Sequence, residues 1–168
     1  LPLGQELDNI TVLDCETYAV ALSDILVERV YGDAWKDTES RLIKERDLSL
    51  LRGLPFITLL NHINEIVLDQ RIIFSESGFS PEIAFQSESN DLNAKMCRLG
   101  TGAYVSTMDC CRRIFSDTTA GNEKMHIYPI NSGIKPVVIA LSHRKGKHLT
   151  QADRKFINYS REYLNSTI

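Results

Sequence analysis

The sequence predicts an α/β fold built on a mostly parallel sheet. Short apolar segments of strand length alternate with amphipathic segments of helical period along most of the 168 residues. Strands that are separated by helices usually run parallel and are joined by right-handed crossovers. Residues 81–107 give the clearest example, because a strand, a Ser-rich turn, a short helix, a Gly-x-Gly turn and a second strand follow one another there.

The first half of the chain contains two apolar strands, a capped helix, a charged segment and a further strand and helix. Ser23 can cap the first helix, because its side-chain oxygen accepts an unpaired N–H of the first turn, and Gly32 can end it. The charged segment carries the only Trp, Trp35, and is interpreted as an excursion over the surface. In order, we expect strands at residues 9–13 and 17–22, a helix at 24–31, the excursion at 33–44, a buried strand at 56–60 and a helix at 64–77.

The second half continues the same alternation. A short helix is expected after Ser87 or Ser89, either of which can cap it, and Gly100 can end it in a left-handed conformation. Apolar residues at helical spacing are expected to place that helix on the core: Leu92, Met96 and Leu99, together with Phe85 of the preceding strand. We then expect a helix from Thr107 or Asp109 to Phe115, a loop at 117–124, strands at 125–130 and 136–142, and a last helix capped by Thr150 with Ala152, Phe156, Tyr159 and Tyr163 on one face.

Composition argues against several classes of function. The net charge of −3 and pI near 5.8 give no general attraction to phosphate backbones. No apolar run approaches the ~20 residues of a membrane helix, and residues 1–13 do not read as a signal peptide, so a cytoplasmic protein is expected. The four cysteines, Cys15, Cys97, Cys110 and Cys111, have no CxxC spacing and are interpreted as reduced, buried thiols. No motif indicates a metal, a cofactor or catalysis, so an enzyme is not expected.

Three segments resemble the effector-binding domain of the LysR-type transcriptional regulators. The first is residues 81–107, PEIAFQSESNDLNAKMCRLGTGAYVST. The second is residues 54–78, which look like the family's PFI strand, ligand-facing loop and following helix, and the third is residues 125–164, which resemble its closing strands, basic loop and terminal helix. The resemblance implies a bilobal fold like that of the type 2 periplasmic binding proteins. Nothing in the chain corresponds to the family's winged helix-turn-helix or to its opening β-α-β, so the first lobe is expected to be incomplete.

The resemblance also implies how the chain divides. Residues 1–22 and 136–168 would form the remainder of the first lobe, and residues 23–135 would form the second lobe. The chain would cross between the lobes at two hinge segments, which consist of Ala21, Leu22 and Ser23 and of Lys135, Pro136 and Val137. A ligand would lie in the cleft between the lobes, where closure about the hinges reports its presence.

Candidate ligand-binding residues follow from the resemblance and from the rule that open α/β sheets bind ligands beyond the carboxyl ends of their strands. The residues between the strand at 56–60 and the next helix are Asn61, His62, Ile63, Asn64 and Glu65, and they would face the cleft. The alternative is an ordinary helix cap at Asn64. Thr101 and Gly102 resemble the family's small-residue turn at the cleft floor, although a glycine there can also simply end a helix. Ser87 is a further candidate, although the sequence favours a helix cap over ligand contact for it, as for Ser89.

The function that these observations favour is a small-molecule sensor. We expect an effector-sensing regulatory domain that binds a metabolite between its lobes, acts in a homo-oligomer, and meets DNA only through a winged helix-turn-helix outside this sequence. The effector is expected to carry a carboxylate or another anionic group, because two helix N-termini would point toward the cleft. The alternative is a bilobal solute-binding protein or receptor domain, and an enzyme on a similar frame is a third possibility.

Overall fold

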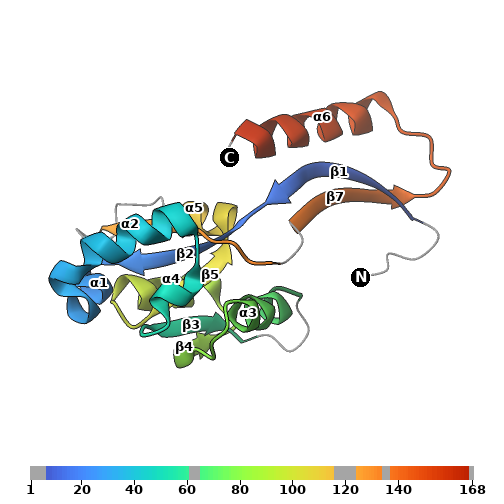
Figure 1. Ribbon diagram of the computed structural model, residues 1–168. Helices are drawn as coiled ribbons and strands as arrows, with labels where there is room; N and C mark the ends of the chain where they lie inside the picture. Colours follow the sequence, from blue (N-terminus) through green and yellow to red (C-terminus); the bar gives the residue numbers. More distant parts are fainter. Residues whose placement is uncertain (1–6, 61–64, 116–123, 134–136, 167–168) are drawn as a thin grey trace. The chain divides into compact units, whose positions relative to one another are not determined.

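The computed structural model describes residues 7–60, 65–115, 124–133 and 137–166. It divides into two compact units, which are described separately (Figure 1). The smaller unit consists of Leu1–Glu16 and Pro136–Ile168, and the larger unit is Thr17–Lys135. The boundary therefore falls at residues 16 and 17, whereas the sequence analysis assigns residues 17–22 to the first lobe.

A five-stranded sheet in the order β4-β3-β5-β2-β6 forms the centre of the larger unit. Its strands are β2 (Tyr18–Ser23), β3 (Pro55–Leu59), β4 (Glu82–Ser87), β5 (Ala103–Thr107) and β6 (Met125–Pro129). β3 runs parallel to β4 and β5, but β2 runs antiparallel to both β5 and β6. The α/β class is confirmed, and so is the mostly parallel sheet, because β3, β4, β5 and β6 run in one direction and only β2 runs against them. β2 ends at the edge of the sheet where β5 and β6 begin.

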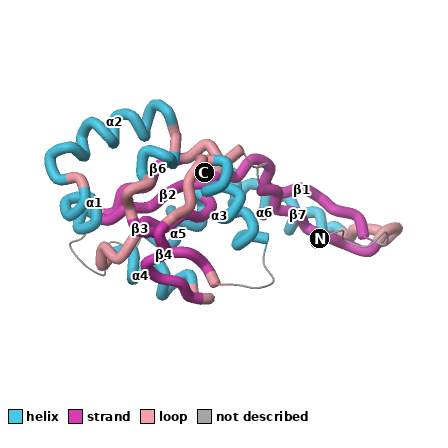
Figure 2. Tube along the Cα trace, turned by 60° about the horizontal axis from the view of Figure 1, so that its bottom comes forward, coloured by secondary structure: helices cyan, strands magenta, loops and turns pink. Residues whose placement is uncertain are grey.

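Helices cover both faces of this sheet (Figure 2). They are α1 (Asp24–Val30), α2 (Trp35–Glu45), α3 (Glu65–Glu76), α4 (Asn90–Arg98) and α5 (Met108–Phe115), with 3₁₀ turns at Gly32–Ala34 and Leu48–Leu51. On β3, Phe56 contacts Phe74 of α3, whereas Ile57 shares a core cluster with Ala94 of α4. Successive residues of a strand point to opposite faces, so α3 and α4 cover opposite faces of the sheet.

The segment around Trp35 differs from the surface excursion that the sequence suggests. Residues 35–45 form α2, which buries Trp35 and Leu42 and exposes its charged residues. The Trp35 ring lies 5.5 Å from the ring of Tyr31 and 6.0 Å from that of Tyr128, measured between centroids. An amphipathic helix with only two inward residues in eleven reads as a charged segment, which is why the sequence pattern is misleading here.

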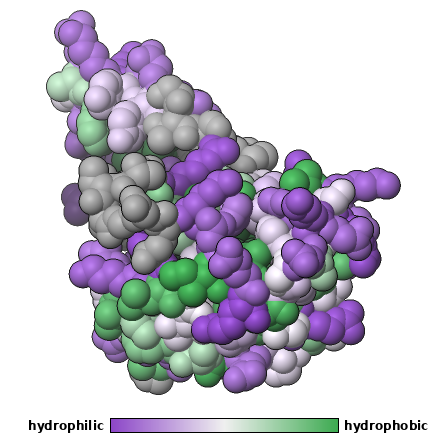
Figure 3. All heavy atoms as spheres, turned by 90° about the vertical axis from the view of Figure 1, so that its left-hand side faces the viewer, coloured by the Kyte–Doolittle hydropathy of each residue, from purple (hydrophilic) through white to green (hydrophobic). Residues whose placement is uncertain are grey.

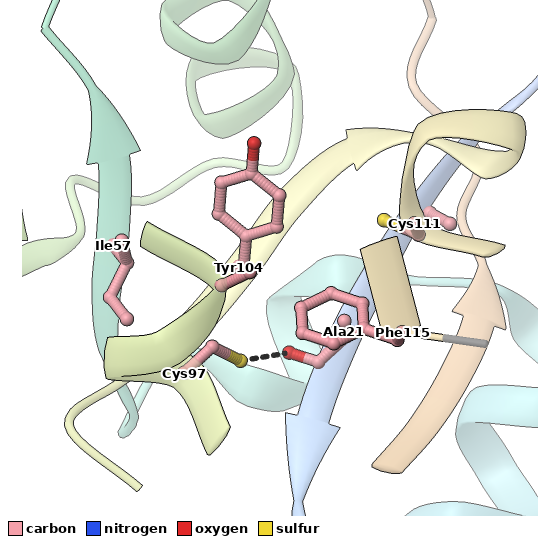
Figure 4. Close-up of a cluster of buried hydrophobic side chains, with 8 residues drawn as sticks. Ala21, Ile57, Cys97, Tyr104, Cys111 and Phe115 are labelled. Carbon is pink, nitrogen blue, oxygen red and sulfur yellow. Dashed lines mark hydrogen bonds between the residues drawn. The ribbon is translucent and has the colours of Figure 1, made fainter. Parts of the chain in front are cut away.

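One core cluster of the larger unit consists of eight buried residues: Ala19, Ala21, Ile57, Ala94, Cys97, Tyr104, Cys111 and Phe115 (Figure 4). Met96 and Phe85 pack partly buried against it. Leu92 and Leu99, which were also expected in the core, are 43% and 62% exposed. That expectation is wrong because α4 turns Asn93, Ala94 and Cys97 inward instead.

Some apolar side chains of the larger unit remain on the surface. Figure 3 views the molecule from the side of α1 and shows apolar residues gathered among polar ones. Ile25, Val30 and Leu99 are among the exposed apolar residues. Within the described ranges, no helix is both long and apolar enough to cross a membrane.

The smaller unit consists of an antiparallel strand pair and one helix. β1 (Leu7–Glu16) pairs with β7 (Val137–Arg144), and α6 (Gln151–Ser166) follows. Thr150 and Asp153 cap α6 reciprocally, as predicted, because Thr150 Oγ1 accepts the Asp153 N–H at 3.2 Å and Asp153 Oδ2 accepts the Thr150 N–H at 2.8 Å. α6 buries Ile157, whereas its predicted aromatic face is exposed: Phe156, Tyr159 and Tyr163.

Candidate functional site

The three parallel strands of the larger unit end at a common edge. β3, β4 and β5 end at Leu59, Ser87 and Thr107, and Leu59 is the register partner of Ser87. One residue further, the Leu60 N–H donates to the Ser87 carbonyl at 2.8 Å. Ligands of open α/β sheets bind at carboxyl ends of this kind. This carboxyl edge is therefore the candidate site within the larger unit.

Ser87 is held at this edge by Asn93, a fully buried residue of α4. Ser87 Oγ lies 2.8 Å from Asn93 Oδ1, and it accepts the Ser89 N–H at 3.2 Å. Asn93 Nδ2 in turn donates to the carbonyls of Ser87 and Thr58, at 3.2 and 3.4 Å. The Asn93 amide therefore joins β3, β4 and α4 at one point.

The N-terminus of α4 begins at the same edge. Ser89 is the N-cap, and its Oγ accepts the Leu92 N–H at 3.3 Å. The Tyr104 hydroxyl of β5 donates to Asn90 Oδ1 at 2.8 Å. Burial raises the pKa of Tyr104, so this phenol stays neutral and acts as a donor. The first turn of α4 is thus fixed to both β4 and β5.

Gln70 fixes α3 to the sheet in a similar way. Its buried amide donates from Nε2 to the Val105 carbonyl at 2.6 Å, and its Oε1 accepts the Leu59 N–H at 3.3 Å. A single side chain thereby completes backbone hydrogen bonds of β3 and β5. The predicted ligand residues Asn61, His62, Ile63 and Asn64 lie outside the described residues. Glu65 is the first residue of α3.

Thr101 and Gly102 lie at the opposite edge of the sheet. They immediately precede β5, and Phe56 near the start of β3 is the register partner of Ala103. A Cβ atom on Gly102 would lie 2.9 Å from the Pro55 carbonyl oxygen. The close approach that glycine permits here is therefore made to the backbone of β3. The structure does not bring Thr101 and Gly102 together with Ser87.

The first predicted hinge segment lies within the larger unit. Ala21, Leu22 and Ser23 are fully buried in β2, and each pairs with a residue of β6. Ser23 also caps α1, as predicted, by accepting the Leu26 N–H at 3.4 Å. Lys135 and Pro136 lie outside the described residues, and Val137 begins β7.

The sequence analysis missed the residues that organise the carboxyl edge, namely Gln70, Asn90, Asn93 and Tyr104. The available signal was a polar side chain, Asn93, between apolar positions of an amphipathic helix. Thr107, which was expected to cap the following helix, does so by accepting the Cys110 N–H at 3.4 Å.

The site carries no group of metal ligands among the residues that the structure describes. The thiol of Cys97 is buried and lies 3.5 Å from the Ala21 carbonyl (Figure 4). Burial raises the pKa of Cys97 to about 12, so the reactive thiolate is not formed near neutral pH. Cys97 and Cys111 are buried, as expected, whereas Cys110 is half-buried.

Comparison with known proteins finds similarity in structure. A scan against protein-family models finds no match, and a search of curated proteins finds no significant match. Among solved structures, the LysR family transcriptional regulator HinK from Pseudomonas aeruginosa matches 98% of this chain with a TM-score of 0.65 and 22% identity. The match covers 50% of the HinK chain, so this chain spans about half of that regulator.

Two effector domains solved with ligands also match. The effector-binding domain of QuiR, in complex with shikimate, has a TM-score of 0.60 and 14% identity over 99% of this chain and 69% of its own. The regulatory domain of CcmR from Synechocystis PCC6803, in complex with 2-PG, has a TM-score of 0.63 and 14% identity over 97% of this chain and 69% of its own.

The fold of this chain is that of the effector-binding domains of LysR-type regulators. The resemblance seen in the sequence is thus confirmed for the fold.

Proposed function

We propose that this chain is the effector-sensing region of a LysR-type transcriptional regulator. It binds a small metabolite against the carboxyl edge of β3, β4 and β5, with Ser87 and the first turn of α4 in contact with the ligand. The observation that carries the proposal is the Ser87–Asn93 network, because a buried amide holds a half-buried hydroxyl at the edge where open α/β sheets bind ligands.

The same edge favours an anionic group on the effector. The N-terminus of α4 presents N–H groups and the positive end of a helix dipole there. Asn61, His62 and Asn64 would add donors from the segment before α3, with Ile63 and Glu65 beside them. Thr101 and Gly102 would contribute to the packing of β5 against β3, because they lie at the edge of the sheet opposite Ser87.

The regulatory step that we propose is a change in the relative orientation of two lobes. Residues 1–22 with 136–168 and residues 23–135 would close around the effector, with hinges near Ala21–Ser23 and Lys135–Val137. A homo-oligomer in the cytoplasm would pass this change to winged helix-turn-helix domains, which alone would contact DNA. The solved neighbours named above support a regulator over a solute receptor or an enzyme, because all three are transcriptional regulators or their regulatory domains.

Calorimetry on the full-length regulator tests the site. Small organic acids are first screened by thermal shift, and a hit is titrated into wild-type, Ser87→Ala, Asn61→Ala, His62→Ala and Asn64→Ala proteins. Ser87→Ala should weaken binding about threefold to tenfold, as expected for one lost hydrogen bond. Ser77→Ala is the matched control, because Ser77 is also half-buried and its hydroxyl bonds within the protein, to the Ile73 carbonyl at 2.7 Å.

An effector whose affinity is unchanged by all four substitutions would contradict the assigned site. An effector that binds as a cation would contradict the charge argument and leave the site itself in place.

A further inference from the structure

A hollow lies on the face of the sheet that α3 covers. It is a groove of about 620 Å³ between α3 and the outermost strand, β4. Its walls come from the second half of α3, from the turn that joins α3 to β4, and from β3 and β4 themselves. Ser87 is not one of its lining residues, but Leu59 and Gln86 are, so the groove begins beside the carboxyl edge and extends from it between α3 and β4.

The floor of the groove is apolar toward the start of β4. Phe74 of α3 and Phe79 of the following turn line it, with ring centroids 5.6 Å apart, and both rings pack on Phe56. Ile83 of β4 lines the same end and is 44% exposed. An aliphatic or aromatic body of a ligand would bury this surface.

The other end of the floor carries a hydroxyl that lacks a partner. Thr58 lies on the same face of β3 as Phe56, two residues further on, and it lines the groove. Its Oγ1 is buried and makes no hydrogen bond to any described part of the chain. Buried polar groups are almost always paired, so this hydroxyl is available to bond an atom bound in the groove. The neighbouring amide of Gln70 is already committed to Leu59 and Val105.

The groove carries a single charged side chain among its described lining residues, which is Arg71 of α3. Arg71 is exposed and stands on the helix turn next to Phe74 and Ser75. The remaining polar lining residues, Ser75, Ser80 and Gln86, are neutral. A guanidinium with no competing carboxylate in the lining favours a carboxylate on the ligand, because the two groups can form paired hydrogen bonds.

We propose that the groove between α3 and β4 is a second binding site, which takes a small carboxylate with an apolar body. Arg71 holds the carboxylate, the rings of Phe74 and Phe79 and the side chain of Ile83 cover the apolar body, and the Thr58 hydroxyl bonds an oxygen of the ligand or of a water bound with it. Arg71 lines the groove and Ser87 does not, so substitutions at these two residues distinguish this site from the carboxyl edge.

The test uses the 168-residue chain and simple probes. Benzoate and hexanoate are titrated by calorimetry and by amide chemical-shift mapping, with benzyl alcohol and hexylamine as neutral and cationic counterparts of similar size. The two acids should bind, and the alcohol and the amine should bind at least about tenfold more weakly. Shifts should concentrate on α3, β3 and β4 around Phe74, Phe79 and Ile83.

Two variants address the two polar contacts. Arg71→Gln should weaken binding of the acids about tenfold. Thr58→Val should weaken it about threefold. Thr58→Val keeps the shape of the side chain and removes an unpaired hydroxyl, so its thermal unfolding temperature should not fall. Arg52→Gln is the matched control, because Arg52 is exposed in the same unit and lies outside the groove.

Four outcomes would overturn the proposal. The first is the absence of acid binding at millimolar concentration. The second is binding that Arg71→Gln and Thr58→Val leave unchanged. The third is loss of binding on Ser87→Ala with the groove variants unaffected, which would assign the acids to the carboxyl edge. The fourth is self-association that sedimentation shows and that Ile83→Ser abolishes, since the groove would then be covered by a second copy of the chain.

Discussion

At the scale of single residues, Asn93 decides how the carboxyl edge is built. It is the only fully buried Asn among the described residues, and its amide satisfies two carbonyls and one hydroxyl from two strands, β3 and β4. An amide in this position stabilises the fold only if all of its partners are in place, because each buried group that is left unpaired costs about 1–3 kcal/mol. The same residue therefore contributes to stability and to the position of Ser87.

We predict that Asn93→Ala lowers the free energy of unfolding by about 2–4 kcal/mol, because it leaves several buried groups without partners. Urea denaturation of the 168-residue chain measures this. Asn131→Ala is the control, since Asn131 is exposed and its side-chain amide donates only to the Glu45 carbonyl, at 3.2 Å, among the described residues. It should cost less than about 0.5 kcal/mol. Equal losses in the two variants would show that Asn93 does not organise the edge.

Gly102 gives a second prediction at the residue scale. Gly102→Ala should cost about 1–3 kcal/mol, because its new methyl group would lie 2.9 Å from the Pro55 carbonyl oxygen and the backbone there cannot easily move. Gly53→Ala is a matched control, since a Cβ atom at Gly53 has nothing within 4 Å. Thermal unfolding of both variants separates a packing role from a general effect of glycine replacement. If Gly102→Ala were as stable as Gly53→Ala, β3 and β5 would not approach as closely as described.

At the scale of elements, the direction in which each helix faces was the least predictable feature. The caps at Ser23, Ser89 and Thr150 could be predicted, because a cap depends on a side chain and the N–H groups two or three residues away. The side of α4 that faces the core could not be predicted. Its leucines and its Asn93 are arranged on different sides, and only the position of Ser87 and Thr58 in three dimensions makes the buried Asn favourable.

The orientation of α4 can be checked by comparing two apolar truncations. Leu92→Ala should cost less than about 1 kcal/mol, because Leu92 is 43% exposed, whereas Ile57→Ala in the buried cluster should cost about 2–5 kcal/mol. Both values come from chemical denaturation. A loss above about 2 kcal/mol for Leu92→Ala would mean that this leucine is buried after all.

The positions of the predicted site residues also depend partly on local sequence and partly on how distant strands pair. Ser87 lies at the carboxyl edge because it follows directly on an apolar strand. Thr101 and Gly102 also adjoin a strand, but they precede it, and in parallel strands this places them at the far edge. The direction of β2 depends on which strands it pairs with, and pairing across about 85 residues of sequence leaves no local signal.

At the scale of the whole molecule, the net charge of the chain bears on whether it binds DNA by itself. We predict that the 168-residue chain does not bind duplex DNA at physiological salt, because its net charge is −3. A gel shift with random-sequence and promoter DNA measures this, and the full-length regulator serves as the positive control. Tight and salt-sensitive binding by the 168-residue chain would contradict both this prediction and the proposed division of roles.

The hydrogen bonds of Asn93 and Leu60 at the carboxyl edge also determine how this part of the larger unit can unfold locally. The hydrogen bonds from Asn93 to Thr58 and Ser87 and from Leu60 to Ser87 share the same few atoms, so the ends of β3 and β4 and the start of α4 should unfold together as one local unit. An effector bound at Ser87 would add its binding free energy to the cost of that opening. The amide hydrogens of Leu60 and Ser89 should then exchange with deuterium more slowly as the fraction of protein with bound effector rises. Exchange at these two backbone positions would therefore report the bound state.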